Sequence, residues 1–222
     1  PRPVVVGMGP AGLFCALGLA ARGAKPILLE RGRPVEDRAA DVAELEQAGV
    51  LNPESNVLFG EGGAGAFSDG KLSLSDEVGG QISEYMGHKR AMEYIKRADD
   101  LYLRFGANPT VHGRDDRRVE EIAYQASRYN IRLIPCPVRH LGTENAGPVL
   151  GAMHDHLVEK TNTTFLELTT AQEILVEDGR VTGVRMQPKD GEAFVARAPY
   201  VVAAPGRGGA QWLSETVGKL GL

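Results

Sequence analysis

Residues 4–30 constrain the fold more than any other part of this sequence. They form the string VVVGMGPAGLFCALGLAARGAKPILLE, in which a β-branched run precedes three closely spaced glycines, an apolar stretch and a second apolar run. This order predicts a strand at 4–6, a helix that opens at the glycines and a second strand at 27–29. The segment is therefore expected to form a βαβ unit of an α/β domain with a central parallel sheet.

Each glycine in this segment has its own physical reason to lack a side chain. Gly7 permits a sharp exit from the strand, Gly9 lets the backbone approach a pyrophosphate, and Gly12 lets the helix pack closely on the sheet. The helix N-terminus presents N–H groups and a positive dipole end to phosphates. The segment predicts a dinucleotide site, although glycines that only form turns would give a similar pattern. The residues expected at the dinucleotide, with an acid for the ribose, are Gly7, Gly9, Pro10, Ala11, Gly12 and Glu30.

A basic turn follows this acid. Arg31 could select a 2′-phosphate, but a carboxylate at Glu30 would repel that group and favours free ribose hydroxyls. Arg38 lies on a helix predicted at 35–47 and is a candidate contact for the pyrophosphate or the adenine. The alternative for Arg38 is a solvated position on the helix surface.

The composition is that of an ordinary globular chain. Its 222 residues are 42% hydrophobic and 24% charged, with a net charge of −4, which gives no support for binding to nucleic acid or anionic membranes. Cys15 and Cys136 form neither a disulfide framework nor a metal site, so no metal is expected. No segment approaches ~18 uninterrupted apolar residues. We expect a cytoplasmic protein with a small-molecule substrate, and leave its oligomeric state open.

A second glycine-rich stretch, FGEGGAGAFSDGKL, covers residues 59–72. Its five glycines between positions 60 and 70 argue against a stable helix or strand. Phe59, Phe67 and Leu72 are able to anchor the loop to a core, which favours a loop held against a flat polar ligand. A plain NAD-binding unit has no need of such a loop, whereas a flavin does.

The remaining elements follow from apolar periodicity and turn residues. A hairpin turn is expected at Asp178-Gly179. The predicted helices cover 83–104, 115–129 and 146–160. The predicted strands cover 131–134, 165–168, 173–177, 181–187, 194–197 and 200–204.

Three runs carry a resemblance to a known family: VEDR at 35–38, LNPESNV at 51–57 and the glycine-rich stretch at 59–72. They resemble bacterial, mostly uncharacterised FAD-dependent dehydrogenases, which are similar to the glutathione-reductase and geranylgeranyl-reductase flavoproteins. The third run matches that family's signature almost letter for letter, and the likeness weakens over about 82–138. The resemblance implies that 1–222 is an FAD/NAD(P)-binding Rossmann-like domain with a β-meander and a helical insertion at about 82–138.

The resemblance also implies site residues. Ala171 would lie near the adenine, and Ala204 and Gly206 would lie on the phosphate side of the flavin. The run His140 to Thr143 is similar to a family motif near the flavin or the substrate entrance, so His140 is a candidate proton donor and Lys71 a second catalytic candidate. The residues implied at the isoalloxazine end are Gly63, Ala64, Gly65, Ser68, Asp69, Gly70 and Lys71.

The implied function is an FAD-dependent oxidoreductase that transfers a hydride or an electron pair through the flavin, with NADH or NADPH as a candidate reductant. Three alternatives stay open: an NAD(P)-dependent dehydrogenase, a flavin- or nucleotide-binding module without turnover, and a tRNA-modifying or sulfur-transferring flavoprotein relative. The absence of basic clusters argues against the last. The family's late Gly-Asp motif and its substrate region are missing from these residues, so we expect a fragment of a longer flavoprotein.

Lys71 generates a first testable prediction. A cation near the flavin N1/C2 carbonyl stabilises the anionic reduced ring, and each 1.36 kcal/mol of stabilisation is about a tenfold change in equilibrium. We expect Lys71→Met to lower the midpoint potential of the bound flavin, measured by anaerobic redox titration. An unchanged potential would place Lys71 in solvent, away from the ring.

Overall fold

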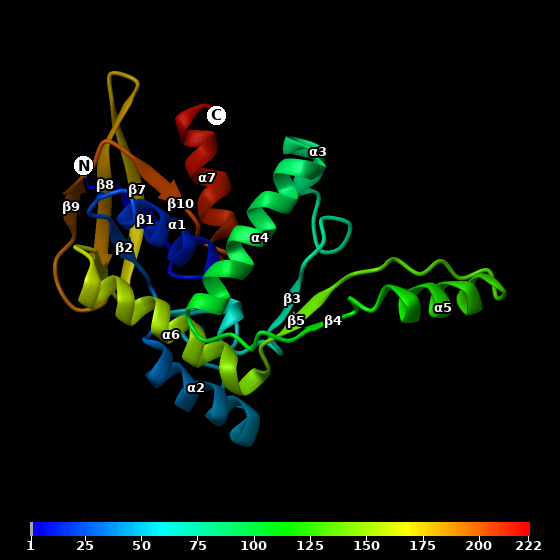
Figure 1. Cartoon of the computed structure of the whole chain (residues 1–222). Helices are drawn as coiled ribbons and strands as arrows, with labels where there is room; N and C mark the ends of the chain where they lie inside the picture. Colours follow the sequence, from blue (N-terminus) through cyan, green and yellow to red (C-terminus); the bar gives the residue numbers. More distant parts are fainter. Residues whose placement is uncertain (1) are drawn as a thin grey trace. The chain divides into compact units, whose positions relative to one another are not determined.

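The computed structural model describes residues 2–222, which form two compact units (Figure 1). The first unit comprises the residues up to Phe67 together with Leu150–Leu222, and the second comprises Ser68–Val149. The second unit is thus an insertion into the chain of the first.

The first unit is built on a four-stranded parallel sheet. Its strands are β10 (Val201–Ala203), β1 (Val4–Val6), β2 (Ile27–Leu29) and β6 (Thr164–Leu166), in that spatial order. Every residue of β1 and β2 is buried, which explains why these strands are continuous apolar runs without polar alternation. The predicted central parallel sheet is therefore confirmed.

Helix α1 (Pro10–Ala20) connects β1 to β2. A Cβ added to Gly12 would lie 1.8 Å from the carbonyl oxygen of Gly7, so no larger residue fits at this point of contact. Leu13 and Ala16 are fully buried on the same helix. The close approach of helix and strand that the glycine pattern predicts is therefore present.

The first unit has further helical segments besides α1. Helix α2 (Val35–Ala48) ends at Gly49, whose φ of 69° gives the left-handed C-cap that glycine favours. Helix α6 (Thr143–Lys160) contributes its residues from Leu150 onward to this unit. The remaining ones are η1 (Gly63–Gly65), η2 (Arg207–Gly209) and α7 (Ala210–Leu220).

An antiparallel meander, β7 (Thr169–Glu177), β8 (Arg180–Pro188) and β9 (Phe194–Arg197), completes the first unit. Asp178 and Gly179 both have positive φ values, 51° and 71°, as a tight two-residue hairpin turn requires. The buried side of the meander and the parallel sheet share one hydrophobic core. Its buried members are Val4, Val6, Ile27, Leu29, Ala171, Val184, Met186 and Ala198.

The second unit combines a small sheet with helices. Its strands are ordered β3-β5-β4 and all pair antiparallel. The strands are β3 (Lys71–Ser73), β4 (Val111–His112) and β5 (Val138–His140). The helices wholly within this unit are α3 (Ile82–Met86), α4 (His88–Arg104) and α5 (Asp116–Ser127).

Two sequence predictions in this unit need correction. The single helix at 83–104 is two helices, because Gly87 takes a φ of 78° between them. The prediction of a strand at 131–134 is wrong, because the structure has no strand at these described residues. Strand β5 lies instead at Val138–His140, where a loop was expected. The partners of β5 come from distant parts of the chain, and such pairing overrides the local preference of a short apolar run.

Alternation along β5 explains the packing of the second unit. Arg139 is 3% exposed and donates to the buried Asp99 of α4, with Nη2 2.8 Å from Oδ2, and to the carbonyl oxygen of Asn108 at 2.7 Å. The neighbouring residue His140 is exposed. One side of β5 therefore joins the sheet to α4, and the other side is exposed at His140.

This buried pair generates a prediction for stability. Arg139→Met leaves Asp99 buried without a partner, which we expect to cost about 3 kcal/mol in the free energy of unfolding. The measurement is urea denaturation monitored by circular dichroism.

The matched control is Arg118→Met, which removes an exposed ion pair to Glu121 on α5 of the same unit. We expect this control to cost less than about 1 kcal/mol. Equal losses in the two variants would contradict a special role for the buried pair.

Candidate functional site

The turn between β1 and α1 forms an open anion-binding surface. Gly9 is the N-cap of α1, no side chain caps the helix, and its first turn has no acidic residue. A Cβ added to Gly9 would have only the Cα of Gly63 within 4 Å, at 3.8 Å. The helix N-terminus therefore combines a favourable dipole with an uncovered backbone, as a bound phosphate requires.

The glycine-rich loop that includes η1 lies directly against this turn. The N–H of Gly62 donates to the carbonyl oxygen of Met8 at 2.9 Å. A Cβ added to Gly63 would lie 2.9 Å from the Cα of Gly9, and one added to Gly65 would lie 3.0 Å from Cγ of Pro10. Residues 60–65 therefore lie against the β1–α1 turn, and the predicted contact of either segment with a cofactor stays a prediction.

Arg38 holds this loop in place. The side chain is fully buried, and its guanidinium donates to three backbone carbonyls: Asn56 at 2.7 Å, Gly63 at 3.0 Å, and Glu61. It also lies over the ring of Phe67, 4.8 Å from the centroid. In the structure Arg38 therefore binds backbone carbonyls, and its predicted direct contact with the cofactor stays a prediction.

Burial of this guanidinium has an electrostatic cost. Desolvation lowers the pKa of Arg38 to about 10, while the carboxylates of Glu30 and Glu61 oppose the shift. A pKa of about 10 still leaves the side chain protonated at neutral pH. The positive charge is therefore available to bind the loop carbonyls under physiological conditions.

The side chain of Glu30 links the end of β1 to the end of β2. Its two carboxylate oxygens accept from the backbone N–H groups of Met8, at 3.0 Å, and Gly32, at 2.9 Å. Each carboxylate oxygen has a second lone pair, so the predicted ribose contact stays a prediction. Arg31, the next residue, forms an ion pair with Glu54 at 3.5 Å.

The C-terminal candidates lie in different surroundings. Ala204 is adjacent to Gly7. Its N–H donates to the carbonyl oxygen of Val6 at 2.8 Å, and its own carbonyl oxygen would lie 2.2 Å from a Cβ added to Gly7. Gly206 has a φ of 65° and open space around it. Ala171 is buried in the core of the meander. The structure therefore brings Ala204 to the glycine turn, and the contact of Ala171 with the adenine stays a prediction.

The later part of the predicted cofactor loop belongs to the second unit. Ser68 accepts from the N–H of Gly70 at 3.1 Å, and the ammonium of Lys71 pairs with Asp69 at 2.7 Å. The hydrogen bond from Lys71 lowers the pKa of the Asp69 carboxyl. Lys71 thus has a carboxylate partner two residues away, and its place near the flavin stays a prediction.

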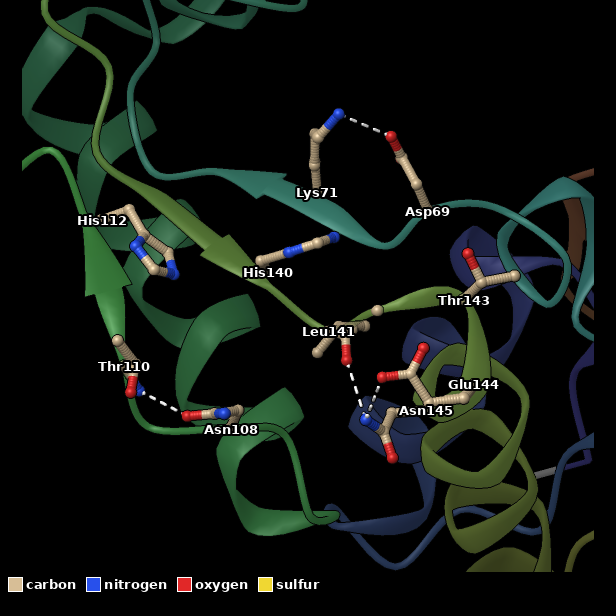
Figure 2. Close-up of a pocket in the computed structure, with 11 residues that line it drawn as sticks. Asp69, Lys71, Asn108, Thr110, His112, His140, Leu141, Thr143, Glu144 and Asn145 are labelled. Carbon is tan, nitrogen blue, oxygen red and sulfur yellow. Dashed lines mark hydrogen bonds and ion pairs between the residues drawn. The ribbon is translucent and has the colours of Figure 1, made fainter.

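Both catalytic candidates line one cavity of about 460 Å³ in the second unit (Figure 2). Lys71 on β3 is directly opposite His140 on β5, and His112 on β4 is opposite Val138, two residues before His140. These positions share one face of the sheet. The other lining residues are Asp69, Asn108, Thr110, Leu141, Gly142, Thr143, Glu144 and Asn145.

This lining is polar and contains two imidazoles. The ring nitrogens of an imidazole donate or accept hydrogen bonds, so His112 and His140 are able to contact a small polar molecule. His112 was not among the site residues predicted from the sequence. Its strand is only two residues long, and no local pattern marks so short a strand.

Comparison with solved structures supports the fold. An L-amino acid deaminase from Proteus vulgaris matches 100% of this chain and 50% of its own, with a TM-score of 0.53 and 14% identity. A glycine oxidase from Bacillus cereus matches 98% and 57%, with a TM-score of 0.51 and 16% identity. A 3-ketosteroid dehydrogenase from Rhodococcus jostii matches 90% and 44%, with a TM-score of 0.53 and 18% identity. This chain therefore spans about half the length of these proteins.

Sequence comparisons identify the family. An uncharacterized protein of Clostridium beijerinckii is 64% identical over 72 residues, which are 32% of this chain and 14% of that protein. Within the described residues, no helix has the length and apolar character needed to cross a membrane. The family model described as "FAD binding domain" matches residues 2–221. The chain therefore belongs to the FAD binding domain family.

Proposed function

We propose that this chain is the FAD-binding part of an oxidoreductase that acts on a small polar molecule. The observation that supports it is the contact between the β1–α1 turn and the loop at 60–65, in a chain of the FAD binding domain family. The resemblance of residues 59–72 to bacterial FAD-dependent dehydrogenases supports a dehydrogenase over the other oxidoreductase types.

The residues of the first unit fit this cofactor. The uncapped N-terminus of α1, with Gly9 at its start, suits the pyrophosphate, and the carboxylate of Glu30 has lone pairs left for a ribose hydroxyl. Bound FAD supplies the transfer of a hydride or an electron pair, and the protein supplies position and electrostatics. Arg38 contributes by donating to the carbonyl oxygens of Asn56 and Gly63, which holds the loop in place.

The substrate side of the proposal rests on the cavity of the second unit. Its volume of about 460 Å³ is within the range of small-molecule pockets. His140 is the proposed proton donor or acceptor, with His112 on the same sheet face as a second imidazole. The ion pair of Lys71 with Asp69 provides both a donor and an acceptor for a polar substrate.

An absorbance spectrum of the purified protein is the direct test. We expect maxima near ~375 and ~450 nm, the optical signature of an oxidised flavin. Anaerobic addition of NADH or NADPH should bleach the longer-wavelength band if either nucleotide is the reductant.

The outcomes separate the open alternatives. A colourless protein that binds NAD(P) would contradict the flavin assignment and favour a nicotinamide-dependent dehydrogenase. A yellow protein that no reductant or donor bleaches would favour a binding module without turnover.

Gly9 generates a prediction for affinity. Gly9→Ala adds a methyl group to the open surface of the α1 N-terminus, where it touches little protein but takes space that the pyrophosphate needs. We expect the Kd for FAD to rise at least about tenfold, equivalent to about 1.4 kcal/mol, in fluorescence titration of the apoprotein.

The matched control is Gly18→Ala in the same helix, where the added Cβ meets only the end of the Arg22 side chain at 3.8 Å. We expect this control to bind FAD with unchanged affinity. Unchanged affinity in Gly9→Ala would instead show that the cofactor does not approach this turn.

A further inference from the structure

Three side chains from separate segments meet in the first unit. Glu61 comes from the glycine-rich loop, His154 from α6, and Glu167 from the connection between β6 and β7. One ligand atom of each residue lies within 4.8 Å of those of the other two. Glu61 is buried and the other two are half-buried, so the cluster is not a chance gathering of fully exposed acids.

The surroundings orient two of these side chains. Oε2 of Glu61 accepts from the N–H of Val35 at 3.0 Å, and Oε1 contacts Nδ1 of His154. The imidazole stacks on the ring of Phe165, with centroids 4.3 Å apart and planes within 1°. Metal ligands in proteins typically have outer contacts of the kind that Val35 and Phe165 make here, which hold carboxylate and ring in one orientation.

The charge of the cluster favours a cation. Two carboxylates converge on one imidazole, and the negative charges of Glu36 and Asp37 also act on Glu167. The nearby positive charge of Arg38 is directed to loop carbonyls. A divalent ion bound among the three side chains would add positive charge beside two carboxylates and could take the place of a proton on the imidazole.

We propose that Glu61, His154 and Glu167 form a binding site for a divalent transition-metal ion of the Zn²⁺ class. One imidazole nitrogen and two carboxylate oxygens are donors that Zn²⁺ accepts, and three protein ligands leave a further position for water. The ion would tie the loop at 60–65 to α6 and to the β6–β7 connection, and so support the loop that faces the β1–α1 turn.

This proposal departs from the sequence prediction of no metal. The ligands are separated by 93 residues between Glu61 and His154, so no spacing motif marks them. The proposal is also independent of the flavin assignment, because the three ligands do not include the glycine turn or Glu30.

The test uses the whole chain with its cofactor, freed of metal by a chelator. We expect ZnCl₂ to bind with 1:1 stoichiometry in calorimetry, and CoCl₂ to produce visible ligand-field absorption after subtraction of the flavin spectrum. His154→Gln and Glu167→Gln should each weaken Zn²⁺ binding at least about tenfold. The matched control His156→Gln, two residues further along α6, should bind Zn²⁺ like the unmodified chain.

Two results would overturn the proposal. The first is no saturable binding of either ion to the unmodified chain, which would leave the cluster as an ion pair between Glu61 and His154. The second is equal Zn²⁺ affinity in the unmodified chain, His154→Gln and Glu167→Gln. The flavin spectrum of each variant reports whether it folds, and a retained spectrum with lost metal binding separates this proposal from the cofactor assignment.

Discussion

The loop at 60–65 depends on one buried guanidinium. Glycine-rich backbone loses much conformational freedom when it becomes ordered, and this loop has only a short 3₁₀ turn to offset that cost. Arg38 supplies donors to the carbonyls of Asn56, Glu61 and Gly63 from one planar group. One side chain of α2 therefore supplies three of the hydrogen bonds that order this segment, beside the bond from Gly62 to Met8 that joins it to the β1–α1 turn.

This arrangement explains why two glycine-rich segments are needed. The first, at the β1–α1 turn, presents N–H groups, and the second lies so close to it that Gly63 has no room for a side chain, whereas Gly9 stays open to a ligand. In the function that we propose, this double surface holds the FAD of the family to which the chain belongs. The chemistry then belongs to the cofactor, and the protein determines where the cofactor lies and which groups face it.

Much of the first unit was predictable, because its signals are local. The runs at 4–6 and 27–29, the stop at Gly49 and the Asp178-Gly179 turn are all where the sequence indicates them. The sheet of the second unit was missed, since strands of two or three residues are defined by partners far away in the chain. The hydrogen-bond partners of Arg38 could not be predicted either, because they are backbone carbonyls, which no sequence pattern marks.

Strand β5 separates the buried framework of the second unit from the cavity that we propose for the substrate. Arg139 faces α4 and belongs to the buried framework, whereas His140 beside it faces the cavity. Substitutions at His140, Lys71 or His112 therefore leave the Asp99–Arg139 pair untouched. A lineage of related enzymes is thus free to change what the cavity accepts, one residue at a time, while retaining the framework that keeps the three strands together.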